Sequence, residues 1–420
     1  MRAARAARGD GRGGIVKALR FAAPIPTYLA TLAAGAISDR FFVGPGACTR
    51  YLDVEPPALP GDRWVRVRTR LGGICGSDLG IVTLKASPST SPFSSFPFVL
   101  GHENVGEVLE AGAAVKGFSP GQRVVANPLL SCEPRGLEPP CPECAAGRPS
   151  RCSRFTDGPL PPGMFIGTTR GLGGSWGEQF VAHERQLLVV PDSLSDEAAV
   201  LTEPFACSVH AVRGNLPRAG ERVLVLGAGS IGLLTVAALR ALAPAAELTV
   251  VARHRFQEEH ALRLGAARVV AARGDYLEAL AGACGARLLQ PLVGRRIAVG
   301  GFDSAFVCIG GTRGMEDAIG FTRAGGTVVL LGNASTLRGL DWTPLWLKEL
   351  TVRGSVAYGN HAHAGVAIGE FAEALELIAG GRAEVGPLLT HSFPLAEYRR
   401  ALGAALDKGG ARSVKVAFRF

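Results

Sequence analysis

The pattern of hydrophobic and polar positions changes near Pro191, and the two sides of that point predict different kinds of structure. Before it, short apolar runs with β-type alternation are separated by Gly and Pro, so we expect a β-rich region from Val16 to about Leu188. The Ser/Pro/Phe-rich stretch Ser87–Phe98 indicates an inserted loop. The clearest expected strands are Trp64–Thr69, Asn104–Glu110, Arg123–Asn127 and Phe180–Ala182.

After Pro191 the pattern predicts helices and buried strands in alternation. Ser195–His210 is expected to be helical, and a final part from about Val356 is expected to hold a helix, Gly365–Ala379, and a strand, Ser413–Phe418. Between them the expected strands are Arg222–Leu226, Leu248–Ala252, Ala305–Ile309 and Thr327–Leu331, with helices at Ser230–Ala243, Phe256–Leu264 and Met315–Arg323. Such alternation is typical of a parallel sheet covered by helices on both faces.

Composition and charge narrow the class of protein. The chain has 420 residues, 47% of them hydrophobic, which suggests two or three globular domains. Its longest suggestive apolar stretch, Tyr28–Ile37, is shorter than the ~20 residues of a membrane span, so we expect no membrane insertion. The net charge is +9. Residues 1–14, which we expect to form a disordered basic tail, contain four arginines and one aspartate and so contribute part of this charge. No basic run with interleaved aromatic residues follows, which argues against nucleic-acid binding.

Nine cysteines, an odd number, are concentrated in the first half of the chain, with five of them between Cys75 and Cys152. No secretory signal precedes them. This clustering favours metal sites in a reducing compartment over a disulfide framework, so we expect a cytoplasmic protein.

A glycine-rich motif, Gly227-Ala228-Gly229-Ser230-Ile231-Gly232, directly follows an expected strand and opens an expected helix. In that context the glycines allow a tight turn and a close approach of the backbone to a dinucleotide diphosphate. The next strand ends at Ala252, where an NAD site places a carboxylate; here Arg253 and Arg255 follow instead. Arginine suits a 2′-phosphate, so NADP(H) is preferred over NAD(H), although both arginines could be solvated surface charges.

Two further motifs, Gly101-His102-Glu103-x2-Gly106-x5-Gly112-x2-Val115 and the upstream Gly73-Ile74-Cys75-Gly76-Ser77-Asp78, together resemble the catalytic-zinc signature of the medium-chain zinc alcohol dehydrogenases. The resemblance extends over roughly residues 15–420 and implies a GroES-like β domain, a Rossmann domain and a return to the first domain. It also implies that Cys75, His102 and Glu103 lie at a catalytic zinc. Thiolate, imidazole and carboxylate are ligands that zinc accepts.

The resemblance assigns roles to three more positions. The family takes another zinc ligand from the junction between domains, where the Glu203-Pro204 pair looks like the polyol-dehydrogenase branch. Cys207 is the rival ligand, although a small buried hydrophobic role is more usual for such a cysteine. Ser77 stands where the family places the hydroxyl that begins proton removal. Gly80 stands where many members have a relay histidine, so the proton is expected to leave through water.

A cysteine motif, Cys132-x8-Cys141-x2-Cys144-x7-Cys152, resembles the structural-zinc lobe of the same family. The last three cysteines fit the family spacing, whereas Glu138 occupies the position of the first. Either Cys132 supplies the fourth thiolate across an insertion, or the lobe is incomplete. Four thiolates would form a closed structural site without a part in catalysis.

These observations predict an α/β protein with a GroES-like catalytic domain (15–207), a Rossmann cofactor domain (208–355) and a return to the catalytic domain (356–420). The expected function is zinc-dependent hydride transfer between NADP(H) and a secondary alcohol or polyol, or the matching ketone or aldehyde. A biosynthetic carbonyl reductase and a non-catalytic NADPH-binding sensor or scaffold are the alternatives. We expect Ser87–Phe98 and Thr343–Trp346 to line the substrate pocket, and a homo-oligomer, dimer or tetramer, as in the family.

Overall fold

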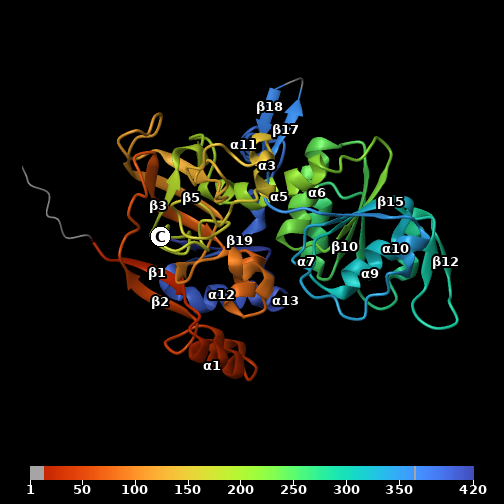
Figure 1. Ribbon diagram of the computed structural model, residues 1–420. Helices are drawn as coiled ribbons and strands as arrows, with labels where there is room; N and C mark the ends of the chain where they lie inside the picture. The colour runs from red at the N-terminus through yellow and green to blue at the C-terminus, as the bar shows by residue number, and fades with distance from the viewer. Residues whose placement is uncertain (1–13, 364–365) are drawn as a thin grey trace, which may run out of the picture.

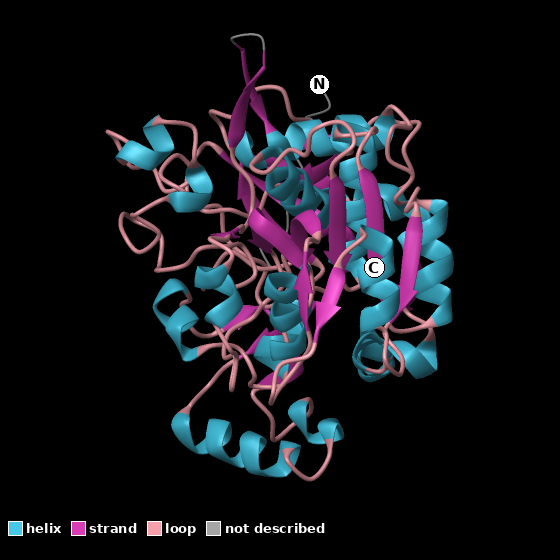
Figure 2. Ribbon diagram, turned by 90° about the vertical axis from the view of Figure 1, so that its right-hand side faces the viewer, coloured by secondary structure: helices cyan, strands magenta, loops and turns pink. Residues whose placement is uncertain are grey.

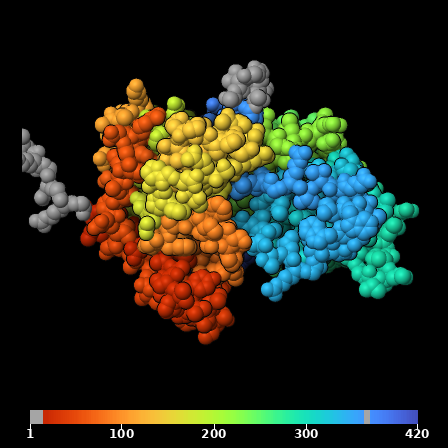
Figure 3. Space-filling view, in the orientation of Figure 1, coloured from red at the N-terminus to blue at the C-terminus, as the bar shows by residue number. Residues whose placement is uncertain are grey.

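The computed structural model describes residues 14–363 and 366–420, which form two α/β halves lying side by side (Figure 1). The expected tail at residues 1–14 therefore lies outside the described residues except for Gly14. A space-filling view shows the residues before about 200 gathered on one side and those of the cofactor half on the other (Figure 3). The predicted class, a β-rich GroES-like domain with a doubly wound parallel sheet, is confirmed.

The second half is built on a six-stranded sheet with the strand order β11-β10-β9-β14-β15-β16, and every neighbouring pair is parallel. This order is that of a dinucleotide-binding fold, with the change of direction between β9 and β14. The strands are β9 (Arg222–Leu226), β10 (Glu247–Ala252), β11 (Arg268–Ala271), β14 (Phe302–Val307), β15 (Thr322–Leu330) and β16 (Thr351–Gly354). A hairpin of β12 (Arg287–Leu289) and β13 (Ile297–Val299) projects beyond them.

Alternate residues of β9 show that helices pack on both faces of this sheet. Val223 and Val225 belong to the apolar cluster that contains α6 (Ser230–Leu242) and α5 (Thr202–Arg213). Leu224 and Leu226 belong to a second cluster with α8 (Leu277–Cys284) and α9 (Thr312–Phe321). A strand buried on both faces has no polar side to expose, which accounts for its unbroken apolar sequence. The remaining helices of this half are α7 (Arg255–Arg263) and α10 (Thr343–Leu347).

The first half contains a mostly antiparallel sheet that takes strands from both ends of the chain. Its order is β19-β20-β3-β5-β6-β8, and β7 pairs with β3. The strands are β3 (Trp64–Gly73), β5 (Asn104–Ala111), β6 (Arg123–Ala126), β7 (Gln179–His183), β8 (Leu187–Val189), β19 (Leu389–Pro394) and β20 (Lys415–Arg419). Because β20 pairs with β3, with Ala417 opposite Gly73, the return of the chain to its first half is visible in the topology.

Smaller elements frame this sheet. A three-stranded sheet of β1 (Val16–Phe21), β2 (Thr49–Val54) and β4 (Phe98–Val99) lies beside it, and β4 ends the stretch expected to be an inserted loop. Short helices are α2 (Gly76–Val82), α3 (Pro142–Ala145), α12 (Tyr398–Leu406) and α13 (Lys408–Ala411).

Two helix predictions were wrong in their extent. The expected helix Ser195–His210 is divided into α4 (Asp196–Ala199) and α5, because Pro204 lacks the N–H that would continue a helix through the preceding turn. The expected helix Gly365–Ala379 begins only at Glu370, as α11 (Glu370–Ala379). The described residues before it form a hairpin of β17 (Asn360–His363) and β18 (Val366–Gly369), which rises from the top of the molecule in Figure 1.

The apolar stretch near Tyr28 is a helix, α1 (Ile25–Gly35), which the strand-type pattern of this region did not predict. It projects from the body of the molecule (Figure 2). On its inner side, Thr31 accepts a hydrogen bond from the Cys48 N–H at 3.2 Å, while the side chains of Ile25 and Leu29 are exposed. Among the described residues, no helix is long and apolar enough to cross a membrane.

Candidate active site and metal centres

Three potential metal ligands meet between β3 and β5. Cys75, His102 and Glu103 each offer one ligand atom, and these three atoms lie within 4.8 Å of one another. Cys75 immediately precedes α2, while His102 and Glu103 immediately precede β5, so the ends of two paired elements bring them together. One thiolate, one imidazole and one carboxylate are a ligand set that fits zinc and leaves a position for substrate.

Asp78 orients two of these ligands. Its carboxylate lies 3.2 Å from His102 Nδ1 and accepts a hydrogen bond from the Cys75 N–H at 3.1 Å. Bonding at Nδ1 leaves Nε2 of His102 free for a metal. Burial alone would lower the pKa of His102, but Asp78 holds that pKa well above its ordinary value. The negative groups around His102 therefore stabilise positive charge on its ring. Asp78 belongs to the motif found in the sequence, but no role was predicted for it.

Glu103 is completely buried and is paired with Lys415 of β20. The Lys415 Nζ lies 2.5 and 2.7 Å from the two carboxylate oxygens and also donates to the Ile74 carbonyl. A Cβ at Gly73 would come within 2.0 Å of the same carboxylate, so glycine is required beside it. Lys415 was not predicted from the sequence, where its signal is a single charge in the otherwise apolar run Val414–Phe418.

Glu203 is buried without a strong partner in α5. Its Oε1 accepts from the Tyr358 hydroxyl at 3.4 Å and lies 3.7 Å from Cys207 Sγ, one helical turn further on. Burial raises the pKa of Glu203 to about 7. The carboxylate lies outside the group of three ligand atoms that converge within 4.8 Å. The rival, Cys207, has a thiol whose pKa burial raises well above its ordinary value, so it stays protonated without a metal.

Ser77 occupies the first turn of α2, two residues after Cys75, and is partly buried. Gly80 lies on the same helix, and a Cβ there would make ordinary contact with Ala86, 3.8 Å away. The helix therefore has a hydroxyl in the turn that follows Cys75 and no imidazole at position 80.

Four cysteines form a second group in the loop around α3. Cys132, Cys141, Cys144 and Cys152 place their sulfurs within 4.8 Å of one another, and the Cys132–Cys152 and Cys141–Cys152 distances are 3.6 and 3.9 Å. Tetrahedral Zn–S bonds of about 2.3 Å put sulfurs about 3.8 Å apart, so the group fits zinc. The structure thus brings Cys132 to the other three across the insertion.

Backbone groups near the four cysteines favour a thiolate and hold the loop in place. Burial would raise the pKa of the Cys141 thiol, but N–H groups of Cys144 and Ser153 lower it to about 6, which makes a thiolate available at neutral pH. The fully buried Arg135, within the insertion, donates to five carbonyl groups, those of Leu130, Asp157, Leu160, Pro161 and Gly163. Arg135 holds the two ends of the loop together, and its role was not predicted from the sequence.

The glycine-rich motif forms the turn between β9 and α6. Gly227 has φ +98°, and a Cβ there would lie 2.3 Å from Ile309. A Cβ at Gly232 would lie 1.8 Å from the Gly227 carbonyl, so the turn cannot close with a larger residue. Gly229 precedes Ser230 and Ile231 at the start of the 13-residue helix α6, whose first N–H groups point out of the turn. This geometry fits the diphosphate of a dinucleotide.

The end of β10 presents positive charge. Arg253 is exposed, and the N–H groups of Arg253 and His254 donate to Gln257 Oε1. Arg255 is exposed as well, and its side chain lies 3.4 Å from Glu259 one turn along α7. Of the two predicted arginines, Arg253 is therefore the one without a described carboxylate partner.

The metal ligands and the glycine-rich turn meet at one stretch of backbone. Ser230 Oγ donates to the Val414 carbonyl at 2.6 Å, and the next residue, Lys415, holds Glu103. Residues 414–415 thus touch both groups of predicted site residues, which lie far apart in the sequence.

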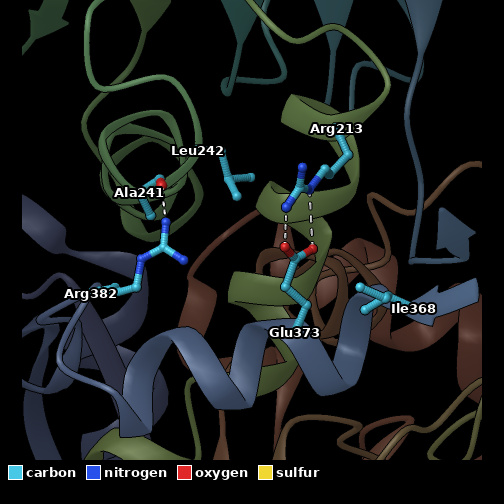
Figure 4. Close-up of a pocket in the computed structure, with 6 residues that line it drawn as sticks. All are labelled: Arg213, Ala241, Leu242, Ile368, Glu373 and Arg382. Carbon is cyan, nitrogen blue, oxygen red and sulfur yellow. Dashed lines mark hydrogen bonds and ion pairs between the residues drawn. The ribbon is translucent and has the colours of Figure 1, made fainter. Parts of the chain in front are cut away.

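The cavity of about 320 Å³ drawn in Figure 4 lies elsewhere, between α5, α6 and α11. Arg213 and Glu373 form an ion pair across it, and Arg382 donates to the Ala241 carbonyl. None of the predicted site residues lines it, nor do the segments expected to form the substrate pocket.

Comparisons with known proteins agree with this geometry. Residues 61–192 match the family model of the alcohol dehydrogenase GroES-like domain, and residues 230–380 match that of zinc-binding dehydrogenases. The chain is 30% identical over 370 residues to sorbitol dehydrogenase of Arabidopsis thaliana, covering 87% of this chain and 92% of that protein. It is 30% identical over 374 residues to L-idonate 5-dehydrogenase of Vitis vinifera, covering 88% and 92%.

Among solved structures, a Sinorhizobium meliloti 1021 protein bound to NADP and assigned as a zinc-binding dehydrogenase is similar to this chain. The two are 27% identical, the alignment covers 97% of this chain and 100% of that one, and the TM-score is 0.71.

Proposed function

Because this chain belongs to the zinc-dependent medium-chain dehydrogenases of the polyol and threonine dehydrogenase type, we propose that it transfers hydride between NADP(H) and a secondary alcohol or polyol. The observation that carries the proposal is the contact of Val414 and Lys415 with both the ligand group and the glycine-rich turn. It brings a metal-ligand set and a dinucleotide turn to one place, as hydride transfer requires.

In this proposal Cys75, His102 and Glu203 hold zinc, with Glu103 beside it. Zinc supplies a Lewis acid that lowers the pKa of an alcohol hydroxyl. Asp78 fixes the orientation of His102 and Cys75, and Lys415 provides the counter-charge for the fully buried Glu103. The buried Glu203, which has no positively charged hydrogen-bond partner among the described residues, supports its place as the ligand from the domain junction.

Ser77 would take the proton from the substrate hydroxyl. Since Gly80 offers no group that could pass the proton on, water would carry the proton from Ser77 to the solvent. The cysteine group around Cys132 would hold a second, structural zinc, because the sulfur spacings fit a closed tetrahedral site.

The cofactor preference rests on Arg253 at the end of β10. No acidic residue stands between Glu247 and Glu258, so no carboxylate there would repel a 2′-phosphate. The NADP bound to the Sinorhizobium meliloti relative is consistent with this preference. Kd values for NADPH and NADH, measured by fluorescence titration of the protein and of Arg253→Asp, test it. Tighter binding of NADH by the unmodified protein would contradict it.

The substrate class is proposed from the relatives, since sorbitol and L-idonate dehydrogenases oxidise polyhydroxy compounds by name. We expect NADP⁺ reduction with polyols and secondary alcohols, and its loss after removal of zinc by a chelator. The test is a panel of polyols, secondary alcohols and their ketones assayed with both cofactors. A protein that holds zinc and binds NADPH, yet turns over no member of the panel in either direction, would contradict the proposal.

Three wider features complete the proposal. All nine cysteines are free thiols, which supports a reducing, cytoplasmic location. We propose domain limits at 15–207, 208–355 and 356–420, although α5 runs continuously across residue 207. We also propose a homo-oligomer, a dimer or tetramer, as the family resemblance implies.

A further inference from the structure

The segment Lys408–Val414 of the first half lies directly over the cofactor region of the second half. Lys408 begins α13, and its Nζ lies 3.5 Å from the position that a Cβ on Gly229 would occupy. Further along, the Val414 carbonyl accepts from Ser230, and Arg412 stacks over the Phe256 ring at 5.9 Å. One short segment therefore covers the glycine-rich turn and the start of α7.

The ammonium group of Lys408 has no direct acidic partner in the part of the chain that the structure describes, although Cys75 and Glu103 act on its charge from further away. Among the described residues its Nζ takes part in no hydrogen bond or ion pair, although the side chain is partly buried. Two other lysines that are buried do have partners: Lys348 donates to carbonyl groups at the end of α9, and Lys415 is held by Glu103. Burial and the nearby Lys415 lower the pKa of Lys408 by more than Cys75 and Glu103 raise it, so a bound anion would stabilise its charged form.

The backbone next to Lys408 indicates which anion would bind there. The turn Gly227–Gly232 opens α6, whose N–H groups and dipole attract a phosphate. We propose that Lys408 binds the diphosphate of the dinucleotide from the side opposite to the glycine-rich turn. The inference rests on the proposed cofactor and adds a ligand that the other half of the molecule supplies.

This placement gives Lys408 a different task from that of Arg253. The diphosphate is common to NADH and NADPH, whereas only NADPH has a 2′-phosphate for Arg253 to bind. Lys408 should therefore strengthen the binding of both dinucleotides equally. Because it reaches across from the first half, its contact also ties the two halves together when the cofactor is bound.

The test is direct binding, measured by fluorescence or calorimetric titration with zinc-loaded protein. A charged hydrogen bond of this kind is lost in Lys408→Ala, so we expect Kd to rise about ten- to a hundredfold for NADPH, NADH and ADP-ribose alike. Lys408→Arg should restore most of the affinity. Binding of 2′-AMP, which has no diphosphate, should be nearly unchanged.

Lys116→Ala is the matched control, since it removes the same charge from an exposed position of the same half. A Lys408→Ala variant that unfolds at the same temperature as the unmodified protein, yet binds both dinucleotides with unchanged Kd, would overturn the inference. A loss confined to NADPH would also overturn it, since it would place Lys408 at the 2′-phosphate. If the unmodified protein bound neither dinucleotide, the proposed function itself would fail.

Discussion

At the scale of single residues, the active site is defined by how its buried charges are balanced. Glu103 and Lys415 balance each other, Asp78 balances His102, and Glu203 has only neutral partners. Burial raises the pKa of Glu203 to about 7, so a cation bound beside this carboxylate would stabilise its charged form. This difference, rather than sequence position, separates Glu203 from the other acids of the site.

Replacing Glu203 and Cys207 one at a time should therefore give opposite results. Glu203→Ala should abolish activity and reduce zinc at the catalytic site, because it removes a ligand, while the protein stays folded. Cys207→Ala should keep most activity, because it removes a small neutral thiol. X-ray absorption on the zinc-loaded enzyme, after allowance for the four-cysteine site, should show one sulfur at the catalytic metal. A second sulfur, or an inactive but folded Cys207→Ala, would assign the ligand to Cys207 instead.

Breaking the Glu103–Lys415 ion pair should destabilise the folded protein. Lys415→Met leaves a fully buried carboxylate without its counter-charge, and we expect the free energy of unfolding to fall by about 3–5 kcal/mol. The double variant Glu103→Gln/Lys415→Met removes both charges and should regain much of that loss. Denaturant unfolding of the four members of this cycle measures the coupling. Additive losses would show that the two groups do not stabilise each other.

At the scale of elements, the loop from Cys132 to Cys152 shows how an insertion can be accommodated. Arg135 ties the loop through five carbonyl groups, and Cys132 then reaches the other thiolates. The sequence predicted the last three cysteines from their spacing, but it left the part of Cys132 open. No local pattern revealed Arg135, because its partners lie far along the chain.

Zinc content checks this arrangement. We expect two zinc ions per chain in protein purified without chelator, and one in Cys132→Ser, where a three-thiolate site binds zinc more weakly. Arg135→Met should also lower the zinc content, since it leaves five carbonyl groups without their shared donor. Elemental analysis measures the zinc content of both variants. Arg170→Met, a change at an exposed arginine, serves as a control. One zinc in the unmodified protein, unchanged in Cys132→Ser, would show that the lobe binds none.

The contact of α5 with α11 should make stability depend on pH. Burial would raise the pKa of Glu370, but its hydrogen bond to His210 and the Gly359 N–H lower it overall. The unfolded chain therefore binds more protons at this carboxyl, and the stability it contributes is present above its ordinary pKa and lost as pH falls below it. The faces toward it also carry Arg213, His361 and Glu373.

Melting temperatures between pH 3 and 7 test this pH dependence. The difference between the unmodified protein and Glu370→Gln should be largest near neutral pH and should shrink as the pH falls below about 4.5. Glu376→Gln, an exposed change on the same helix, provides the control. A difference that stays constant over this range would show that the ionised carboxylate is not what stabilises the contact.

At the scale of the whole molecule, the sequence predicted individual strands and helices better than contacts between distant residues. The strand Arg222–Leu226 and the turn after it were predicted correctly, because an apolar run followed by glycines is a local signal. The division at Pro204 and the hairpin before Glu370 were not, since tertiary pairing decides such boundaries. Lys415 and Lys408 were missed for the same reason: each acquires its role only when residues 408–419 fold back onto the first half.

The return of the C-terminal residues to the first half affects how the protein folds during its synthesis. β20 is translated after every other described strand, yet it lies next to β3 in the sheet and brings Lys415, the counter-charge of Glu103. The cofactor half is continuous from β9 to β16 and can fold earlier. The first half cannot complete its sheet until β20 has been synthesised, and until then Glu103 has no counter-charge. A premature stop codon between Arg412 and Lys415 should therefore leave a chain whose first half is digested rapidly by protease while its cofactor half resists.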